Sequence, residues 1–317
     1  MNEEKQSKSE EKQSMDETQP KDEKQAEASP PVKFEELQTA PPKQKIKLSW
    51  VGKAAAAIIA IWIIIAFAGP FIAPFHEADM IADDSFLPAD GQFWLGSDYL
   101  GRDTFSRILW GARTTIGISF IATLAAYFFG ITLGIAAAVK GGWTDTGLSR
   151  VNDAILSLPT IMLGLIIIAA LGSSITILIL TAGLIYAASV YRIARALGQD
   201  IMVADFVECA RARGEGVWWI ILREVLPNCA MPLATDFGLR LVFVILFISS
   251  LSFLGLGVQP PMSDWGSMVR ENLQGLGYGS FAAIWPALAI ATLTISVNLV
   301  VDDISAAAGG KLAGKMV

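Results

Sequence analysis

The side chains that usually carry out chemistry are scarce in this sequence. It contains one histidine, His76, and two cysteines, Cys209 and Cys229, and their spacing is not that of metal ligands. No Ser/His/Asp arrangement, Cys/His pair or carboxylate dyad in helical register is present. We therefore expect no catalytic centre and no metal site. His76 lies in an acidic loop and is expected to be solvated.

A glycine-rich stretch over 309–316 nearly spells a phosphate-binding loop. It runs GGKLAGKM, so Met316 stands where such a loop needs the Ser or Thr hydroxyl that holds magnesium. No strand pattern precedes it, although a phosphate-binding loop follows a strand. We expect the chain not to bind ATP, so the energy for its function must come from a partner or an ion gradient.

A polar, charged island over 206–233 separates two long apolar runs. Its pattern predicts two short amphipathic helices with a break at Gly214, because glycine ends helices and permits sharp turns. The helical repeat predicts these apolar faces: Phe206, Cys209 and Ala210 on the first helix, and Trp218, Ile221, Leu222 and Val225 on the second. Lipid headgroups, the protein's own helices or a partner could cover them.

The composition is that of a membrane protein. The chain has 317 residues, of which 53% are hydrophobic and 17% charged, and its mean hydropathy is +0.49. Soluble domains are less apolar. The net charge of −6 is no argument for an acidic or basic ligand, because much of the acid lies in the N-terminal segment and one loop. Nucleic acid is not an expected partner, whereas a lipid bilayer is.

Apolar runs long enough to cross a bilayer predict an all-α, polytopic protein with six transmembrane helices. The predicted spans cover 54–69 with its flanks, 114–139, 154–171, 175–191, 230–256 and 281–301. A short amphipathic piece over 104–113 is expected before the second span, and a polar link over 141–155 before the third. In the link over 259–280, Trp265 is expected to lie at the membrane interface.

The same patterns divide the chain into four parts. Residues 1–47 are rich in Lys, Glu, Gln and Ser and predict a disordered cytoplasmic tail. Residues 48–113 hold the first span and an extracytoplasmic loop. Residues 114–305 form the transmembrane core, which contains a cytoplasmic loop over 202–228, and 306–317 form a cytoplasmic C-terminal tail. The bias of Lys and Arg among the short links favours both termini inside.

Three stretches narrow the interpretation to one family. They are LGSDYLGRD at 95–103, the E-C-A of 208–210 followed by Gly214 and the L-P of 226–227, and LSFLGLGVQPP at 251–261. In this order they resemble the C-type permease of the oligopeptide, dipeptide and nickel ABC importers. The resemblance covers roughly residues 50–300. It implies the type I importer permease fold and a place in the bacterial cytoplasmic (inner) membrane.

The resemblance also implies partners and functional residues. In this family the cytoplasmic loop is a coupling helix that docks on an ATPase subunit, and its glutamate contacts that subunit. The residues that match the motif are Glu208, Cys209, Ala210, Gly214, Leu226 and Pro227. The implied partners are a second, homologous permease forming a heterodimer, two ATPase subunits that hold ATP and Mg, and an extracytoplasmic solute-binding protein. This chain would bind no cofactor.

Two positions depart from the family pattern. Cys209 stands where alanine is usual, a small-for-small change that should be tolerated. Ile248 stands where many relatives carry an acidic residue, and if that acid helps to select or gate cargo, this transporter is expected to differ there. Among polar residues inside the spans, Ser296 and Asn298 are candidates for lining the pathway, with helix–helix hydrogen bonding as the alternative. Asp236 and Arg240 are spaced for an ion pair within one helix.

The cargo class that the resemblance implies is peptides. Nickel complexes, modified peptides and oligosaccharides are the alternatives within the family. A secondary transporter driven by an ion gradient is a rival from another class. Such a transporter usually has internal repeats and an intramembrane ion site, whereas this sequence has no convincing internal repeat and few intramembrane carboxylates. A membrane-anchored scaffold whose tail recruits partners is a second rival.

Overall fold

The structure is a computed structural model that describes residues 48–313, with side chains to residue 306. The predicted tail over 1–47 and the last four residues lie outside the described part. Residues 48–313 contain helices and turns but no β-strand, which confirms the all-α prediction. The α-helices are α2 (Trp50–Ile72), α3 (Thr104–Lys140), α4 (Gly142–Leu156), α5 (Thr160–Leu171), α6 (Ile175–Met202), α7 (Asp205–Ala212), α8 (Val217–Ile220), α9 (Leu226–Phe253), α10 (Trp265–Asn272) and α11 (Ile284–Ala313).

Five helical segments are long and apolar enough to cross a membrane, and α4 with α5 would make a sixth. These two helices are bent by 89° at the break between them. Pro159 lies at this break, where its ring removes a backbone donor and disfavours helical geometry in the preceding residue. The span expected over 154–171 is therefore broken at Pro159, and the polar link expected over 141–155 is largely the helix α4, which begins at Gly142.

Two other helices are longer than predicted. The piece expected over 104–113 is continuous with the second span in α3, and the Asp103 carboxylate caps it by accepting from the Ser106 backbone N–H at 2.8 Å. The second loop helix, α8, runs through a π-helical turn (Ile221–Val225) directly into α9. Pro227 lies directly after the π-helical turn, in which the Leu226 N–H donates to the Ile221 carbonyl, and this local widening accommodates the missing N–H of the proline.

Small residues bring α3 and α6 together, and this is the most extensive helix pair of the molecule. A Cβ added at Gly130 would lie 2.6 Å from the Val190 Cβ, and one added at Gly134 would lie 2.7 Å from the Tyr191 carbonyl oxygen. Both distances are far below van der Waals contact. Gly130 and Gly134 form a G-x-x-x-G pair in the sequence, a spacing that permits the close helix approach seen here.

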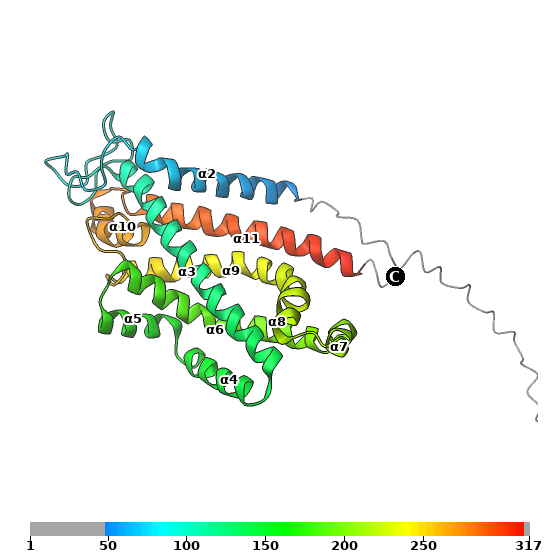
Figure 1. Cartoon of the computed structure of the whole chain (residues 1–317). Coiled ribbons are helices and arrows are strands. Elements are labelled where there is room, and N and C mark those ends of the chain that lie inside the picture. The colour runs from blue at the N-terminus through cyan, green and yellow to red at the C-terminus, as the bar shows by residue number, and fades with distance from the viewer. Residues whose placement is uncertain (1–47, 314–317) are drawn as a thin grey trace, which may run out of the picture. The chain divides into compact units, whose positions relative to one another are not determined.

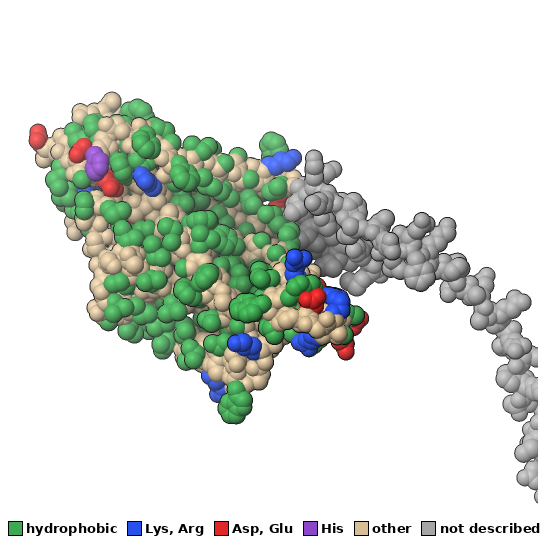
Figure 2. Space-filling view, viewed as in Figure 1, with side chains coloured by type: hydrophobic (Ala, Val, Ile, Leu, Met, Phe, Trp, Pro, Cys, Tyr) green, Lys and Arg blue, Asp and Glu red, His purple; other side chains and the backbone are tan. Residues whose placement is uncertain are grey.

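The polar segments gather at the two ends of the helices. The loop over 73–103 and α10 lie at one end, whereas the start of α2, the end of α11 and the short helix α7 lie at the other (Figure 1). At that second end the Ser49 backbone N–H donates to Asp303 Oδ2 at 2.6 Å. Between the ends, hydrophobic side chains dominate the visible face, and charged side chains gather toward the ends (Figure 2). This distribution fits a bilayer around the middle of the bundle.

Candidate functional site

The predicted cytoplasmic loop is a compact helical turn whose pivot is Gly214. The helix α7 ends in a Schellman motif, in which the Gly214 N–H donates to the Arg211 carbonyl at 2.9 Å and the Glu215 N–H donates to the Ala210 carbonyl at 3.1 Å. Gly214 has a φ of +82°, a left-handed conformation that other L residues adopt only with strain. The structure thus explains why glycine stands between the two loop helices.

One face of this loop is locked into the helix bundle. Val207 and Ala210 of α7 are fully buried, as is Val225 in the turn that follows α8. They belong to one apolar cluster with residues of α3 and α6, among them Ile135 and Val190. The loop cannot move far without moving these helices, because a close-packed cluster resists deformation.

The bundle covers only part of the apolar faces predicted for the two loop helices. Ala210 is buried together with Val207, whereas Phe206 and Cys209 are exposed. Trp218 and Leu222 were predicted to lie beside Val225, yet they are 75% and 59% exposed. The reason is that these short helices carry apolar residues on two sides, and only the bundle decides which side is covered.

The loop therefore exposes both apolar side chains and carboxylates. Phe206, Val217, Trp218 and Leu222 are exposed large hydrophobic residues. Glu208 is also exposed, and no Lys or Arg of the described residues forms an ion pair with it. A surface of this kind suits a protein partner that offers an apolar groove and a hydrogen-bond donor.

The turn itself is held by Arg213. Its guanidinium lies 3.8 Å from the Glu215 carboxylate and 5.6 Å from the centre of the Trp219 ring. Leu226 is half-buried and Pro227 is exposed, and both lie at the start of α9. The residues that match the family motif therefore form one continuous stretch from α7 to α9, with Glu208 on its outer side and Ala210 on its inner side.

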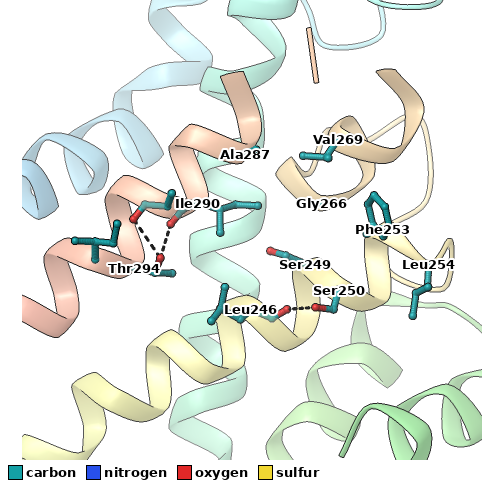
Figure 3. A pocket seen from close by; sticks show the side chains of 12 residues that line it. Leu246, Ser249, Ser250, Phe253, Leu254, Gly266, Val269, Ala287, Ile290 and Thr294 are labelled. Carbon is teal, nitrogen blue, oxygen red and sulfur yellow. Dashed lines mark hydrogen bonds between the residues drawn. The ribbon is translucent and has the colours of Figure 1, made fainter. Parts of the chain in front are cut away.

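A second feature is an apolar cavity of about 650 Å³ between α9, α10 and α11 (Figure 3). Three hydroxyl side chains line it. Two of them are satisfied within their own helices, since Ser250 Oγ donates to the Leu246 carbonyl and Thr294 Oγ1 to the Ile290 carbonyl. The third, Ser249 Oγ, is buried and has no partner among the described residues. The cavity is thus apolar with one available hydroxyl, as in many sites for small molecules.

The residues predicted to line a pathway do not lie in this cavity. Ser296 is buried and Asn298 is half-buried on α11, whereas Thr294 and Ile295 of the same helix line the cavity. Ile248 is fully buried in an apolar cluster and does not line the cavity either. The sequence favoured Ser296 and Asn298 because they are polar, but it could not show which side of α11 faces the cavity.

The predicted ion pair inside the fifth span is present. Arg240 Nε lies 3.3 Å from Asp236 Oδ2, and the Tyr127 hydroxyl of α3 donates to the same oxygen at 2.5 Å. Asp236 is therefore neutralised and hydrogen-bonded within the bundle, which favours a structural role over an ion-binding one.

The structure also shows a buried charge network that the sequence did not reveal. Asp98 accepts from Arg102 Nε at 2.7 Å and from Arg107 Nη1, and Glu271 of α10 accepts from both arginines at 3.1 Å. Arg107 Nε also donates to Ser263 Oγ at 3.1 Å. Two acids and two bases thus join the LGSDYLGRD stretch to α3 and α10. The available signal was one acid and two arginines at 98, 102 and 107, but their partner Glu271 is far away in sequence.

Trp265 is not an interfacial residue, so that prediction is wrong. Its side chain is 0% exposed, its Nε1 donates to the Ile108 carbonyl at 3.1 Å, and its ring packs edge-on against Trp62 at 4.9 Å. Asp264 before it caps α10 and is also buried. Burial raises the pKa of the Asp264 carboxyl above its ordinary value, although hydrogen bonds from Ser267 and Thr115 oppose this.

Neither a metal cluster nor a nucleotide loop emerges from the described residues. No group of three or more His, Cys, Asp or Glu side chains within 48–306 is placed to hold a metal ion. Residues 309–313 of the glycine-rich stretch are helical as part of α11, whereas Met316 lies outside the described range. His76 is exposed, as predicted.

Residues 130–308 match the family described as the binding-protein-dependent transport system inner membrane component. The chain belongs to this family. The matched residues include the loop from α7 to α9 and the cavity beside α11, whereas α2 and the loop over 73–103 lie before them. The chain is therefore a multi-pass permease subunit of an ABC importer, a transport component and not an enzyme.

Curated relatives of this permease cover most of its length. The glutathione transport system permease protein GsiD of Pectobacterium atrosepticum is 32% identical over 263 residues, which make up 83% of this chain and 87% of that protein. The dipeptide transport system permease protein DppC of Alkalihalophilus pseudofirmus is 30% identical over 269 residues, 85% of this chain and 88% of that protein.

A solved structure supports the fold. One chain of the MetNI methionine ABC transporter in an inward-facing conformation matches this permease with a TM-score of 0.52 and 15% identity. The match covers 63% of this chain and 96% of that chain. At this identity the likeness concerns the fold alone, and it confirms the predicted importer permease fold.

Proposed function

We propose that this permease imports peptides or closely related solutes, as one of two homologous permease subunits that together form the pathway. Relatives that are similar over more than four fifths of the chain are named for glutathione and dipeptide transport. Glutathione is itself a modified peptide, so both names point to the same class of cargo. Nickel complexes and oligosaccharides remain alternatives that the uptake experiment below separates.

The observation that carries the coupling role is the two-sided loop from α7 to α9. Its inner face is packed into α3 and α6 through Val207 and Ala210, whereas Trp218, Leu222 and the unpaired Glu208 are exposed. We assign the outer face to an ATPase subunit, with Glu208 as the polar anchor. Two such ATPase subunits, which bind ATP and Mg themselves, would serve the permease pair.

Movement then follows from the packing. When ATP closes the ATPase dimer, a loop held in each ATPase is displaced with it. Because α8 continues into α9 and α7 follows α6, displacement of the loop moves both long helices as rigid bodies. The apolar cavity between α9, α10 and α11 is the part of the pathway that this motion would open or close, with the second permease completing its open side.

The assignment also sets the orientation. The loop from α7 to α9 and both termini would lie in the cytoplasm, and the loop over 73–103 with α10 would lie outside. A solute-binding protein would deliver cargo there. The buried network around Asp98 and Glu271 gives this outer region a fixed shape on which a partner can dock.

The proposal is tested first by mild-detergent purification of the full chain from its own host, followed by mass spectrometry. Recovery of a second permease and of ATPase subunits is the expected result. Uptake of labelled dipeptides, glutathione, nickel and oligosaccharides is then compared in cells with and without the chain. The chain recovered alone, together with uptake that survives ATP depletion but collapses with the ion gradient, would contradict the proposal and favour a secondary transporter.

A further inference from the structure

The surface between α2 and α3 contains a second apolar groove, separate from the cavity beside α11. Its volume is about 570 Å³, and it lies along the helices near the end that carries the loop over 73–103. Its walls are formed by the side chains of Ile63, Phe67 and Phe71 on α2 and of Ile116 and Phe120 on α3. The groove lies in segments that cross the membrane, so its contents come from the bilayer or from another membrane-spanning chain.

No part of residues 48–306 covers the walls of this groove. Phe67 and Phe71 are 77% and 87% exposed, and they lie in the most apolar of the five membrane-length helices among the described residues. The floor is open at Gly117, where an added Cβ would meet no atom within 4 Å. An apolar groove with an open glycine floor offers space for a hydrocarbon chain.

One charged side chain lines the groove, and it is Arg113. It is exposed, and no Asp or Glu of residues 48–306 forms an ion pair with it, whereas Arg102 and Arg107 on the same stretch are both paired. An arginine without an anion on a membrane-facing surface is unfavourable, most of all near the centre of the bilayer and less near the interface.

The depth of Arg113 brings it within reach of the headgroups. It lies in the groove beside Phe67, which comes five residues before the end of α2 and therefore about 8 Å below it. The helix α2 has 23 residues, about 34 Å, and so extends slightly beyond an apolar core of about 30 Å. An arginine at this depth can extend its guanidinium toward the phosphate level while its stem remains on apolar surface.

We propose that this groove binds one anionic phospholipid of the bilayer. One acyl chain lies in the trough over Gly117 between Phe67 and Phe120, and the phosphate accepts charge-assisted hydrogen bonds from Arg113. A lipid meets both demands of the site, because it offers a hydrocarbon chain and an anion on one molecule. A partner helix would have to supply a carboxylate at this depth. The bound lipid would fix α2 against α3.

The inference needs only the membrane location of the chain and not the identity of its cargo. Its test uses the full chain with the subunits that purify with it, held in a zwitterionic detergent. Phosphatidylglycerol and phosphatidylcholine with the same acyl chains are titrated separately, and the bound lipid is counted by native mass spectrometry. We expect tighter binding of one phosphatidylglycerol, since phosphatidylcholine carries a compensating positive charge.

Two variants address the two halves of the site. Arg113→Gln is expected to weaken phosphatidylglycerol binding about tenfold, the effect of losing one hydrogen bond to a charged group. Gly117→Leu places a side chain in the open floor and is expected to remove the bound lipid while Arg113 remains. Both positions face open space, so neither change should unfold the protein. The matched controls are Arg150→Gln and Gly147→Leu, an exposed arginine and an open glycine on α4.

The proposal is overturned by equal binding of the two lipids, or by unchanged phosphatidylglycerol binding in Arg113→Gln. It is also overturned if Phe71→Cys crosslinks to another subunit in the native membrane, because a protein then occupies the groove. Failure of dipeptide uptake or of ATPase recovery would contradict the proposed function but leaves the lipid titration unchanged, so the two outcomes can be told apart.

Discussion

Arg107 near the start of α3 and Glu271 in α10 lie 164 residues apart and meet through Nη2 and Oε2 at 3.1 Å. Both side chains are almost fully buried. Arg107 also contacts Asp98, so a single guanidinium joins the loop over 73–103 to α10 at the end of the bundle that holds both. Buried charges are retained at such a position only when every one of them has a partner, since an unpaired buried charge is strongly unfavourable.

We therefore expect Glu271→Gln to destabilise this end of the protein. The change leaves Arg102 and Arg107 with only Asp98 to balance them, and loss of one partner in a buried network costs about 3 kcal/mol or more. The measurement is thermal unfolding of the detergent-purified protein. Asp83→Asn, at an exposed acid of the same loop, is the control and should leave the transition unchanged. Equal stability of the two variants would mean that the network contributes little.

Long apolar runs made the helices predictable, and local spacing made the Asp236–Arg240 pair and the Gly130–Gly134 contact predictable. What failed depended on the rest of the bundle. Trp265 has polar neighbours and was assigned to the membrane interface, yet Trp62 and α3 enclose it. The sequence left open what covers the apolar residues of α7, and tertiary packing buries Val207 and Ala210 but leaves Phe206 exposed.

The close pairing of α3 with α6 gives a prediction about assembly of the bundle. Gly134→Leu would drive a side chain into the Tyr191 carbonyl and the Ala194 Cβ, which lie only 2.7 and 2.9 Å from an added Cβ. We expect misfolding, measured as loss of the monodisperse peak in fluorescence size-exclusion chromatography. The same change at Gly117, where the space is open, should preserve that peak. A normal profile for Gly134→Leu would show that α3 can shift away from α6.

Glu208 provides the sharpest test of the coupling loop. Glu208→Lys reverses the charge on the outer face of α7 without touching the buried Val207 and Ala210. We expect insertion and thermal stability to remain normal, while binding of the ATPase subunits falls at least tenfold, as for a lost charged contact at an interface. Pull-down of the ATPase subunits measures this. Asp200→Lys, at an exposed acid on α6, is the control, and an equal loss there would mean that charge alone matters.

Gly214 tests the angle between the two loop helices. Gly214→Val forces a β-branched residue into a φ of +82°, which costs roughly 1–2 kcal/mol and favours a different turn. No atom within 4 Å would clash with the new Cβ, so the effect comes from the backbone and not from crowding. We expect transport to fall while membrane insertion persists. Gly216→Val, at a residue with a φ of −74°, should be tolerated; normal uptake in Gly214→Val would mean that the turn is not needed.

Asp264 links the stability of the outer region to pH. Because burial raises its pKa in the folded protein, the folded state still holds a proton at pH values where the unfolded state has lost it. The free energy of unfolding should therefore fall as the pH rises from about 4, the usual pKa of Asp, up to the raised pKa of Asp264, and then stay low. Thermal unfolding across this range measures the trend.

Two substitutions at Asp264 separate its charge from its role as a helix cap. Asp264→Asn keeps an oxygen that can accept from the Ser267 N–H, now 3.0 Å from the carboxylate, but it carries no charge to desolvate. We expect it to be at least as stable as the parent at pH 7 and to lose part of the pH dependence. Asp264→Ala removes the cap and leaves the buried Thr115 hydroxyl without its acceptor, so a loss of about 2 kcal/mol is expected at every pH. If Asp264→Asn is as damaging as Asp264→Ala at neutral pH, the ionised carboxylate is itself stabilising, and the raised pKa of this group is contradicted.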